Sequence, residues 1–93
     1  RIGEIRKAMA RERKLRVTYR NLSGQTNERT VWPTALGFFA ETEILVAWCE
    51  YRAAFRHFRL DRILSLRILE DGLPKPRRAL LAEYRAIEPD ADI

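Results

Sequence analysis

The segment FRHFRLDRI (residues 55–63) places three arginines and the only histidine of the chain among aromatic and aliphatic residues. Just upstream, the segment ILVAWC (residues 44–49) is wholly apolar. Such a run is typical of a strand that is buried on both faces, or on one face with a helix covering the other. An apolar strand beside a strand with fixed cations predicts a small β-domain that presents guanidinium groups to an anionic partner.

Further short strands are predicted elsewhere in the first 70 residues. Apolar and polar side chains alternate over residues 15–20, which is the period of a half-buried strand. Pro33 cannot donate a ladder hydrogen bond and should end a strand or mark a bend, whereas Gly37 should mark a bulge or a close backbone contact. Six strands are expected in all, over residues 15–20, 28–32, 34–40, 44–49, 55–60 and 64–69.

Helical patterns flank these strands. Apolar residues at helical spacing predict a helix over residues 2–13, and a second helix is expected to begin at Pro76. Residues 88–93 are expected to form a frayed tail. Short strands at close intervals, with no helix between them, predict a mainly β fold. We expect a small antiparallel barrel over residues 1–73, followed by a linker, a short helix and the tail over residues 74–93.

Composition and charge restrict the possible functions. The 93 residues suffice for one domain, and the net charge of +5 comes from fifteen arginines and three lysines against thirteen acids. Cys49 is the only cysteine, which excludes an internal disulfide and fits a reduced, cytoplasmic setting. The acids lie mostly in turns, in the first helix and in the tail, so an enzyme is not expected. One histidine and one cysteine cannot make a metal cluster, and neither a metal nor a cofactor is expected.

Four segments together resemble the WYL domain family. They are LRVTYR (residues 15–20), RTVWP (29–33), ILVAWC (44–49) and FRHFRLDRI (55–63), within a resemblance that covers residues 2–73. Glu43-Ile44-Leu45 stands where the family carries its Trp-Tyr-Leu triplet, so only the leucine is shared. The resemblance implies a small Sm-like or SH3-like antiparallel barrel with an N-terminal helix, acting as a sensor domain in bacterial transcription regulators.

The same resemblance implies a partner and a set of binding residues. WYL domains usually follow a DNA-binding helix-turn-helix domain, and they are proposed to bind nucleotides or single-stranded nucleic acid in a basic groove. Nothing in this chain matches a helix-turn-helix, and the chain begins at Arg1, so we expect a piece of a longer protein with its DNA-binding domain upstream. Carried over by motif, the implied binding residues are Tyr19, Arg29, Arg56, His57, Arg59 and Arg62.

The strand that contains the histidine cannot present all of its cations on one face. Arg56 and Arg59 are three residues apart, so they lie on opposite faces if the strand is regular. We favour Arg59 together with His57 on the binding face, because Phe58 and Leu60 should fill the core. Arg56 would then lie on the core-facing side, at the rim.

Each candidate residue also has a purely structural interpretation. Arg56 can pair with Asp61 or a nearby glutamate, and Arg62 can hold a corner by donating to backbone carbonyls. His57 can be a satisfied, half-buried side chain. The ring of Tyr19 belongs with the core, although its hydroxyl can still reach a groove.

Two functions remain open from the sequence. The first is a regulatory domain that senses an anionic effector, either a nucleotide or single-stranded nucleic acid, through an arginine-lined groove. The second is a protein-interaction module, for example a homodimer, without a ligand of its own. No apolar run is long enough to span a bilayer, so no membrane partner is expected.

Overall fold

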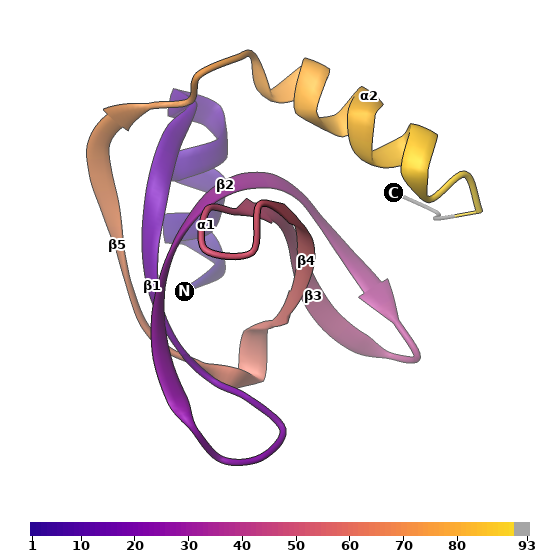
Figure 1. Cartoon of the computed structure of the whole chain (residues 1–93). Helices are drawn as coiled ribbons and strands as arrows, with labels where there is room; N and C mark the ends of the chain where they lie inside the picture. The colour runs from indigo at the N-terminus through magenta and orange to yellow at the C-terminus, as the bar shows by residue number, and fades with distance from the viewer. Residues whose placement is uncertain (91–93) are drawn as a thin grey trace.

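The computed structural model describes residues 1–90, and the end of the expected tail, residues 91–93, lies outside this range. The chain forms a helix, four strands, a short 3-10 helix, a fifth strand and a final helix (Figure 1). Their bounds are α1 Ile2–Arg11, β1 Arg13–Arg20, β2 Thr26–Phe39, β3 Thr42–Cys49, β4 Ala54–Arg59, η1 Leu60–Arg62, β5 Ile63–Gly72 and α2 Arg77–Ile87. The predicted mainly β fold with a helix at each end is confirmed.

The longest strand, β2, corrects the expected number of strands. The sequence predicts two strands on either side of Pro33, whereas the structure has one, so the sheet has five strands rather than six. The register shifts between Pro33 and Ala35, which leaves Thr34 as an extra residue and bends β2. Gly37 lies in regular register, so the bulge is not at the glycine. Pro33 therefore marks a bend without ending the strand.

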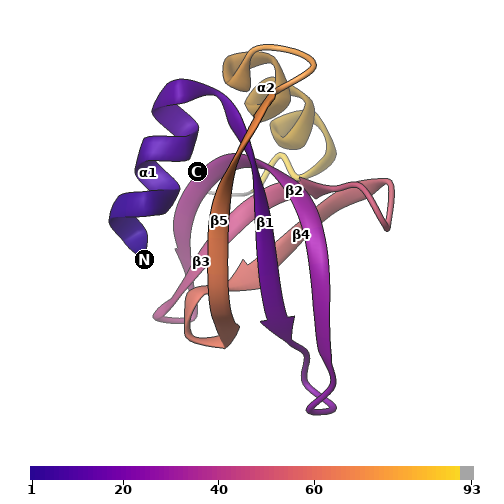
Figure 2. The same ribbon diagram turned by 90° about the vertical axis from the view of Figure 1, so that its left-hand side faces the viewer.

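All five strands pair antiparallel in a single curved sheet, in the order β4-β3-β2-β1-β5. The bend lets β2 pair with β1 along its first half and with β3 along its second half (Figure 1). The edges of the sheet are β4 and β5, which η1 connects, and no strand pairing joins them within residues 1–90. The sheet is thus curved but not closed (Figure 2).

The main hydrophobic core lies on the inner face of this sheet, under α1. Helix α1 packs against β1, β2 and β5 and covers one side of the sheet (Figure 2). Its buried residues are Ile5 and Ala8, which lie three positions apart and therefore on one helix face. They join a cluster of buried strand residues that includes Leu15, Val17, Val31, Leu45, Phe58 and Ile63.

Helix α2 covers the outer face of the sheet at its bend. Its Leu80 and Tyr84 are buried, and Tyr84 belongs to a second cluster with Ala35, Ile44 and Val46. Successive residues of a strand point to opposite faces, so β3 is covered on both sides, by the main core and by α2. Of the two arrangements that the apolar sequence of β3 predicts, the structure thus shows the one with the core on one face and a helix covering the other.

Candidate functional site

The inner face of the sheet changes from apolar to polar toward the turn between β1 and β2. In an antiparallel pair, residues directly opposite each other point to the same face. Val17 is fully buried and lies opposite Arg29, and the next pair on this face is Tyr19 with Asn27. The register of β1 and β2 therefore places an arginine, a tyrosine and an asparagine where the hydrophobic core ends.

Strand β4 adds a cation at the same end of the core. Phe58 is buried, and its ring meets that of Tyr19 edge-on, with 5.2 Å between the centroids. Arg56 precedes Phe58 by two residues on the same face and lies opposite the small, buried Ala47. Arg56 therefore lines the same cavity as Tyr19 and Arg29.

Three arginines from separate segments line this one cavity of about 100 Å³. They are Arg29 of β2, Arg52 of the turn between β3 and β4, and Arg56 of β4. The other lining residues are Tyr19, Asn21, Asn27, Cys49, His57 and Phe58, so no acidic side chain of the described residues faces the cavity. Within residues 1–90 none of the three arginines forms an ion pair. We call this cavity the arginine pocket.

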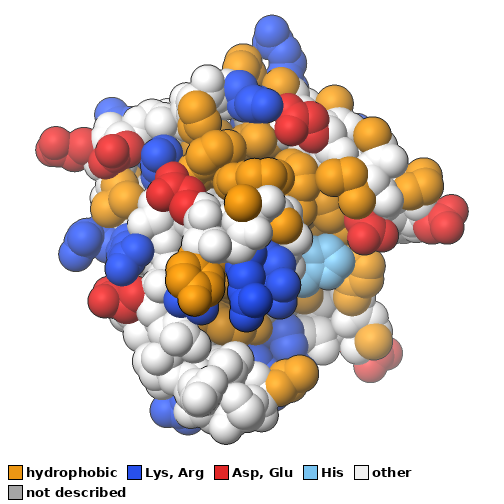
Figure 3. Space-filling view, in the orientation of Figure 1, with side chains coloured by type: hydrophobic (Ala, Val, Ile, Leu, Met, Phe, Trp, Pro, Cys, Tyr) orange, Lys and Arg blue, Asp and Glu red, His pale blue; other side chains and the backbone are white. Residues whose placement is uncertain are grey.

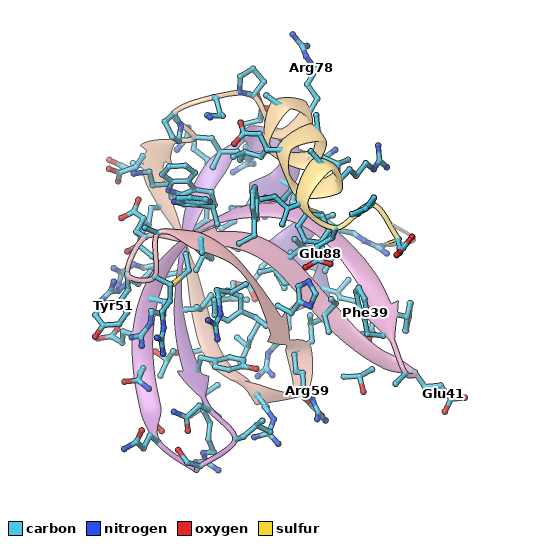
Figure 4. The ribbon with its side chains drawn as sticks, turned by 45° about the vertical axis from the view of Figure 1, so that its right-hand side comes forward. Phe39, Glu41, Tyr51, Arg59, Arg78 and Glu88 are labelled. Carbon is cyan, nitrogen blue, oxygen red and sulfur yellow. The ribbon has the colours of Figure 1, made fainter. Side chains whose placement is uncertain are left out.

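Tyr51 orients two of the three arginines. The guanidinium carbon of Arg29 lies 4.2 Å from the centroid of the Tyr51 ring, and that of Arg52 lies 5.8 Å from it. Such cation–π contacts help to hold a guanidinium in place, and the Nη1 atom of Arg29 also donates to the backbone carbonyl of Glu28 at 2.9 Å. Tyr51 lies at the turn between β3 and β4 (Figure 4), and basic side chains gather on this face of the molecule (Figure 3).

Arg59 lies outside the arginine pocket and has its own counter-ion. Its Nε and Nη2 atoms donate to the two carboxylate oxygens of Asp61, at 3.1 Å and 2.7 Å. These hydrogen bonds hold the pKa of Asp61 below its usual value and raise the pKa of Arg59. Arg59 ends β4, away from Tyr51 at its other end (Figure 4). Asp61 thus pairs with Arg59 and not with Arg56.

Arg62 and Tyr19 stabilise the corner between β4 and β5. The Nη1 atom of Arg62 donates to the backbone carbonyl of Asn21 at 3.2 Å, and its buried Nε atom has no hydrogen-bond partner among residues 1–90. The hydroxyl of Tyr19 accepts the backbone N–H of Arg59 at 3.1 Å. Tyr19 therefore connects β1 to the free edge of β4, while its ring lines the arginine pocket.

His57 borders the arginine pocket and also contacts α2. Its Nε2 atom lies 2.7 Å from the hydroxyl oxygen of Tyr84, and its ring lies 4.9 Å from that of Phe39. Burial lowers the pKa of His57, the Glu88 carboxylate raises it, and the Arg56 guanidinium lowers it further. Because the pKa is lowered, the imidazole is mainly neutral at pH 7 and contributes hydrogen bonds rather than charge.

The structure brings together four of the six residues that the sequence suggested, namely Tyr19, Arg29, Arg56 and His57. The arginine pocket lies on the face of β4 that carries Arg56, whereas the sequence favoured the face of Arg59. Sequence reasoning also missed Arg52 and Tyr51. Their only signal was position, because both lie in the short connection between the apolar and the basic strand.

The pocket has the chemistry of an anion site. Arginine presents a planar fork of N–H donors that matches phosphate or carboxylate, and here three arginines line one small cavity with no acidic residue of 1–90 in its lining. No group of at least three His, Cys, Asp or Glu residues that could hold a metal ion occurs within residues 1–90. Neither of the two helices in this range has the length and apolarity that a bilayer crossing requires.

The chain thus combines a curved antiparallel sheet with a cationic pocket at one end of its hydrophobic core. The family model described as WYL domain matches residues 1–68, so this chain belongs to the WYL domain family. The predicted resemblance is thereby confirmed, and WYL domains occur in transcription regulators.

One solved structure shows how this domain relates to a longer protein. The chain is similar to proteasome accessory factor B/C (PafBC) of Arthrobacter aurescens, with a TM-score of 0.75 and 32% sequence identity. The match covers 84% of this chain but only 12% of that chain, so the present domain corresponds to a small part of it. The comparison with curated proteins found no match.

Proposed function

We propose that this domain senses an anionic effector, a nucleotide or single-stranded nucleic acid, through the arginine pocket. The observation that carries the proposal is the convergence of Arg29, Arg52 and Arg56 on one cavity without an acidic neighbour among the described residues. Like charges held close together repel each other, so the unliganded pocket is electrostatically unfavourable. A bound phosphate would remove this repulsion and accept hydrogen bonds from several guanidinium forks.

The size and the lining of the pocket favour a phosphate over a larger anion. A volume of about 100 Å³ is well below that of pockets that enclose whole drug-sized ligands, roughly 300–1,000 Å³. A single phosphate group therefore enters, and the rest of the ligand stays outside. The side-chain amide of Asn27 adds an uncharged donor at the same cavity, whereas that of Asn21 is hydrogen-bonded within the turn between β1 and β2. His57 and the hydroxyl of Tyr19 supply the remaining polar groups.

The curvature of the sheet is consistent with the same function. We propose that the sheet is a small Sm-like barrel, because β2 bends at Pro33 and the hydroxyl of Tyr19 bridges β1 to the free edge of β4. A barrel holds Arg29 and Arg56, which come from different strands, at a fixed distance from each other. Effector binding would then change the orientation of a DNA-binding domain attached upstream, since a ligand shifts a conformational equilibrium through its differential affinity for the two states.

The test is a titration of the 93-residue chain with a 5′-labelled single-stranded oligonucleotide at about 50 mM and about 200 mM salt. We expect binding that weakens with salt, because phosphate contacts release counterions. Arg56→Ala should weaken binding about tenfold and make the logarithmic salt slope shallower by about 0.7. Arg59→Ala is the matched control, since it removes an arginine from the same strand that Asp61 already neutralises.

The outcomes separate the two functions left open by the sequence. Equal losses of affinity for Arg56→Ala and Arg59→Ala would indicate attraction to net charge alone and would contradict a defined pocket. A stable dimer in size-exclusion chromatography, together with no oligonucleotide affinity at either salt concentration, would favour the protein-interaction module instead.

A further inference from the structure

A second and larger hollow lies on the outer side of β4, beneath α2. It has a volume of about 680 Å³ and is lined mainly by Trp48, Phe55, Tyr84 and Ile87. The Phe55 ring meets those of Trp48 and Tyr84 edge-on, with centroid distances of 5.3 Å and 5.6 Å. Figure 3 shows hydrophobic side chains spread across this face, between α2 and the basic cluster, with the histidine at their border. We call it the aromatic hollow.

The aromatic hollow and the arginine pocket adjoin each other along β4. Arg56 and His57 line both cavities, so a ligand that occupies one reaches the border of the other. The two cavities differ in size and chemistry. The arginine pocket admits a phosphate group, whereas the hollow falls within the roughly 300–1,000 Å³ of small-molecule sites and has aromatic walls. A nucleotide has these two parts, an anionic phosphate and a planar apolar base.

Glu88 adds a polar group to the hollow. It lies just beyond the end of α2 and is one of the residues that line the hollow (Figure 4). A carboxylate accepts hydrogen bonds and donates none when ionised. It therefore favours a base with an exocyclic amino group, as in the pairing of glutamate with the N4 amino group of cytosine. Thymine has no exocyclic amino group, and its one ring donor, N3–H, lies between two carbonyl oxygens that repel a carboxylate.

We propose that the aromatic hollow binds the base of the nucleotide whose phosphate occupies the arginine pocket, with a preference for an amino-bearing base beside Glu88. This inference rests on the proposed function, because it needs the phosphate to be held at Arg56. Aromatic side chains bind bases through their π-faces and apolar surface, and a basic groove next to such residues is the usual composition of single-strand binding sites. The phosphate would then lie on the core-facing side of β4 and the base on its outer side.

The experiment compares three unlabelled chains of equal phosphate number by isothermal titration calorimetry. They are oligodeoxycytidylate, oligodeoxythymidylate and an abasic deoxyribose-phosphate chain. We expect the cytosine chain to bind about tenfold more tightly than the abasic chain, since each stacked base contributes substantially to affinity. We also expect it to bind several-fold more tightly than the thymine chain, and Glu88→Gln should remove this difference.

A surface variant and its control separate base binding from folding. Ile87 is 65% exposed, so Ile87→Ser should leave the fold intact while reducing the advantage of the cytosine chain over the abasic one. Leu22→Ser is the control, because Leu22 is 83% exposed in the turn between β1 and β2 and lines neither cavity. Thermal melting of both variants checks that they fold.

The failure of this inference differs from the failure of the proposed function. If the cytosine and abasic chains bind equally, and both depend on Arg56, the phosphate site stands and the base site is overturned. Equal binding of the cytosine and thymine chains, both tighter than the abasic chain, overturns the role of Glu88. Absence of binding by all three chains overturns the proposed function together with the base site.

Discussion

The Nε2 atom of His57 and the hydroxyl oxygen of Tyr84 lie 2.7 Å apart, and this hydrogen bond connects the edge strand β4 to α2. His57 also borders the arginine pocket, while Tyr84 is almost fully buried between α2 and the sheet. One contact thus links the residue next to the proposed phosphate site to the helix at the C-terminal side of the domain. A ligand that moved β4 would therefore also shift the position of α2 on the sheet.

The His57–Tyr84 contact predicts a pH dependence of stability. The pKa of His57 is lowered, first by burial, so the folded state binds a proton less readily than the unfolded chain does. The free energy of unfolding should therefore fall as the pH decreases from about 6.5, the unfolded value, toward the lower pKa of the folded state. His57→Gln keeps a hydrogen-bonding side chain without this titration and should lose less stability over the same range. Urea unfolding at about pH 7.5, 6.5 and 5.5 measures both proteins.

Two carboxylates whose pKa values are lowered, those of Glu50 and Asp61, act in a lower pH range than His57. The pKa of Glu50 is lowered from 4.5, mainly by the hydrogen bonds from Lys14 and Trp32, and that of Asp61 is lowered from 3.8 by Arg59. A carboxylate with a lowered pKa loses its contribution only below its unfolded value, here below pH 4.5. If the wild type and His57→Gln lose the same stability between pH 7.5 and 5.5, His57 does not cause the loss.

Glu12 connects the two helices, and its substitution should reveal two opposing effects. Its backbone ends α1 in the left-handed region, at φ 53° and ψ 52°. Its side-chain Oε2 accepts the backbone N–H of Arg77 at the start of α2, at 2.6 Å. Glu12→Ala loses this acceptor and keeps the strain, so it should reduce the free energy of unfolding by about 1 kcal/mol. Glu12→Gly loses the acceptor but relieves the strain, and it should be about 1 kcal/mol more stable than Glu12→Ala.

Chemical denaturation of these two variants and the wild type under identical conditions tests both effects, the lost hydrogen bond to Arg77 and the relieved backbone strain. If alanine and glycine are equally stable, the left-handed conformation of Glu12 is not strained. If neither variant differs from the wild type, the Arg77 contact does not contribute to stability.

The sequence predicts elements with a local pattern better than it predicts features that depend on pairing between distant strands. Alternation along β1 and the apolar run of β3 depend only on neighbouring residues, and both strands form where expected. Continuation of β2 through Pro33 is different, because it requires β3 to offer partners on both sides of the bulge at Thr34. That register is a tertiary property. A proline without an N–H marks the site of irregularity but does not reveal whether the strand resumes.

The candidate site could also be predicted only as far as local patterns allow. Strand alternation alone places Arg56 and Arg59 on opposite faces, and the hydrophobicity of Phe58 assigns Arg56 to the core side. The sequence does not show that this core side becomes polar near the β1–β2 turn. That follows from the pairing of Val17 with Arg29, which sets a second arginine beside Arg56. Convergence of cations from different strands is visible only once the register is known.

The lining of the arginine pocket contains no acidic side chain of the described residues, which predicts that the unliganded domain is destabilised by its own charges. Arg56→Gln removes one of three neighbouring cations and should raise the free energy of unfolding by a few tenths of a kcal/mol at low salt. The gain should shrink as salt screens the remaining charges. Thermal unfolding without oligonucleotide, at about 20 mM and about 500 mM salt, measures the effect. Arg59→Gln serves as the comparison and should destabilise slightly, because it leaves Asp61 without its partner. A loss of stability in Arg56→Gln that does not depend on salt would show that the pocket is not under electrostatic strain.

Tyr19 has two separable roles, and removing its hydroxyl tests one of them alone. The hydroxyl accepts the backbone N–H of Arg59 at 3.1 Å, at the free edge of β4, while the ring packs edge-on against Phe58. Tyr19→Phe keeps the ring packing and leaves that N–H without its acceptor, so the free energy of unfolding should fall by about 1 kcal/mol. Amide hydrogen exchange should show faster exchange at Arg59, because the protecting acceptor is gone. An unchanged exchange rate at Arg59 would mean that the hydroxyl does not hold β4 against β1. In that case any loss of oligonucleotide affinity in Tyr19→Phe would reflect a direct contact with the ligand.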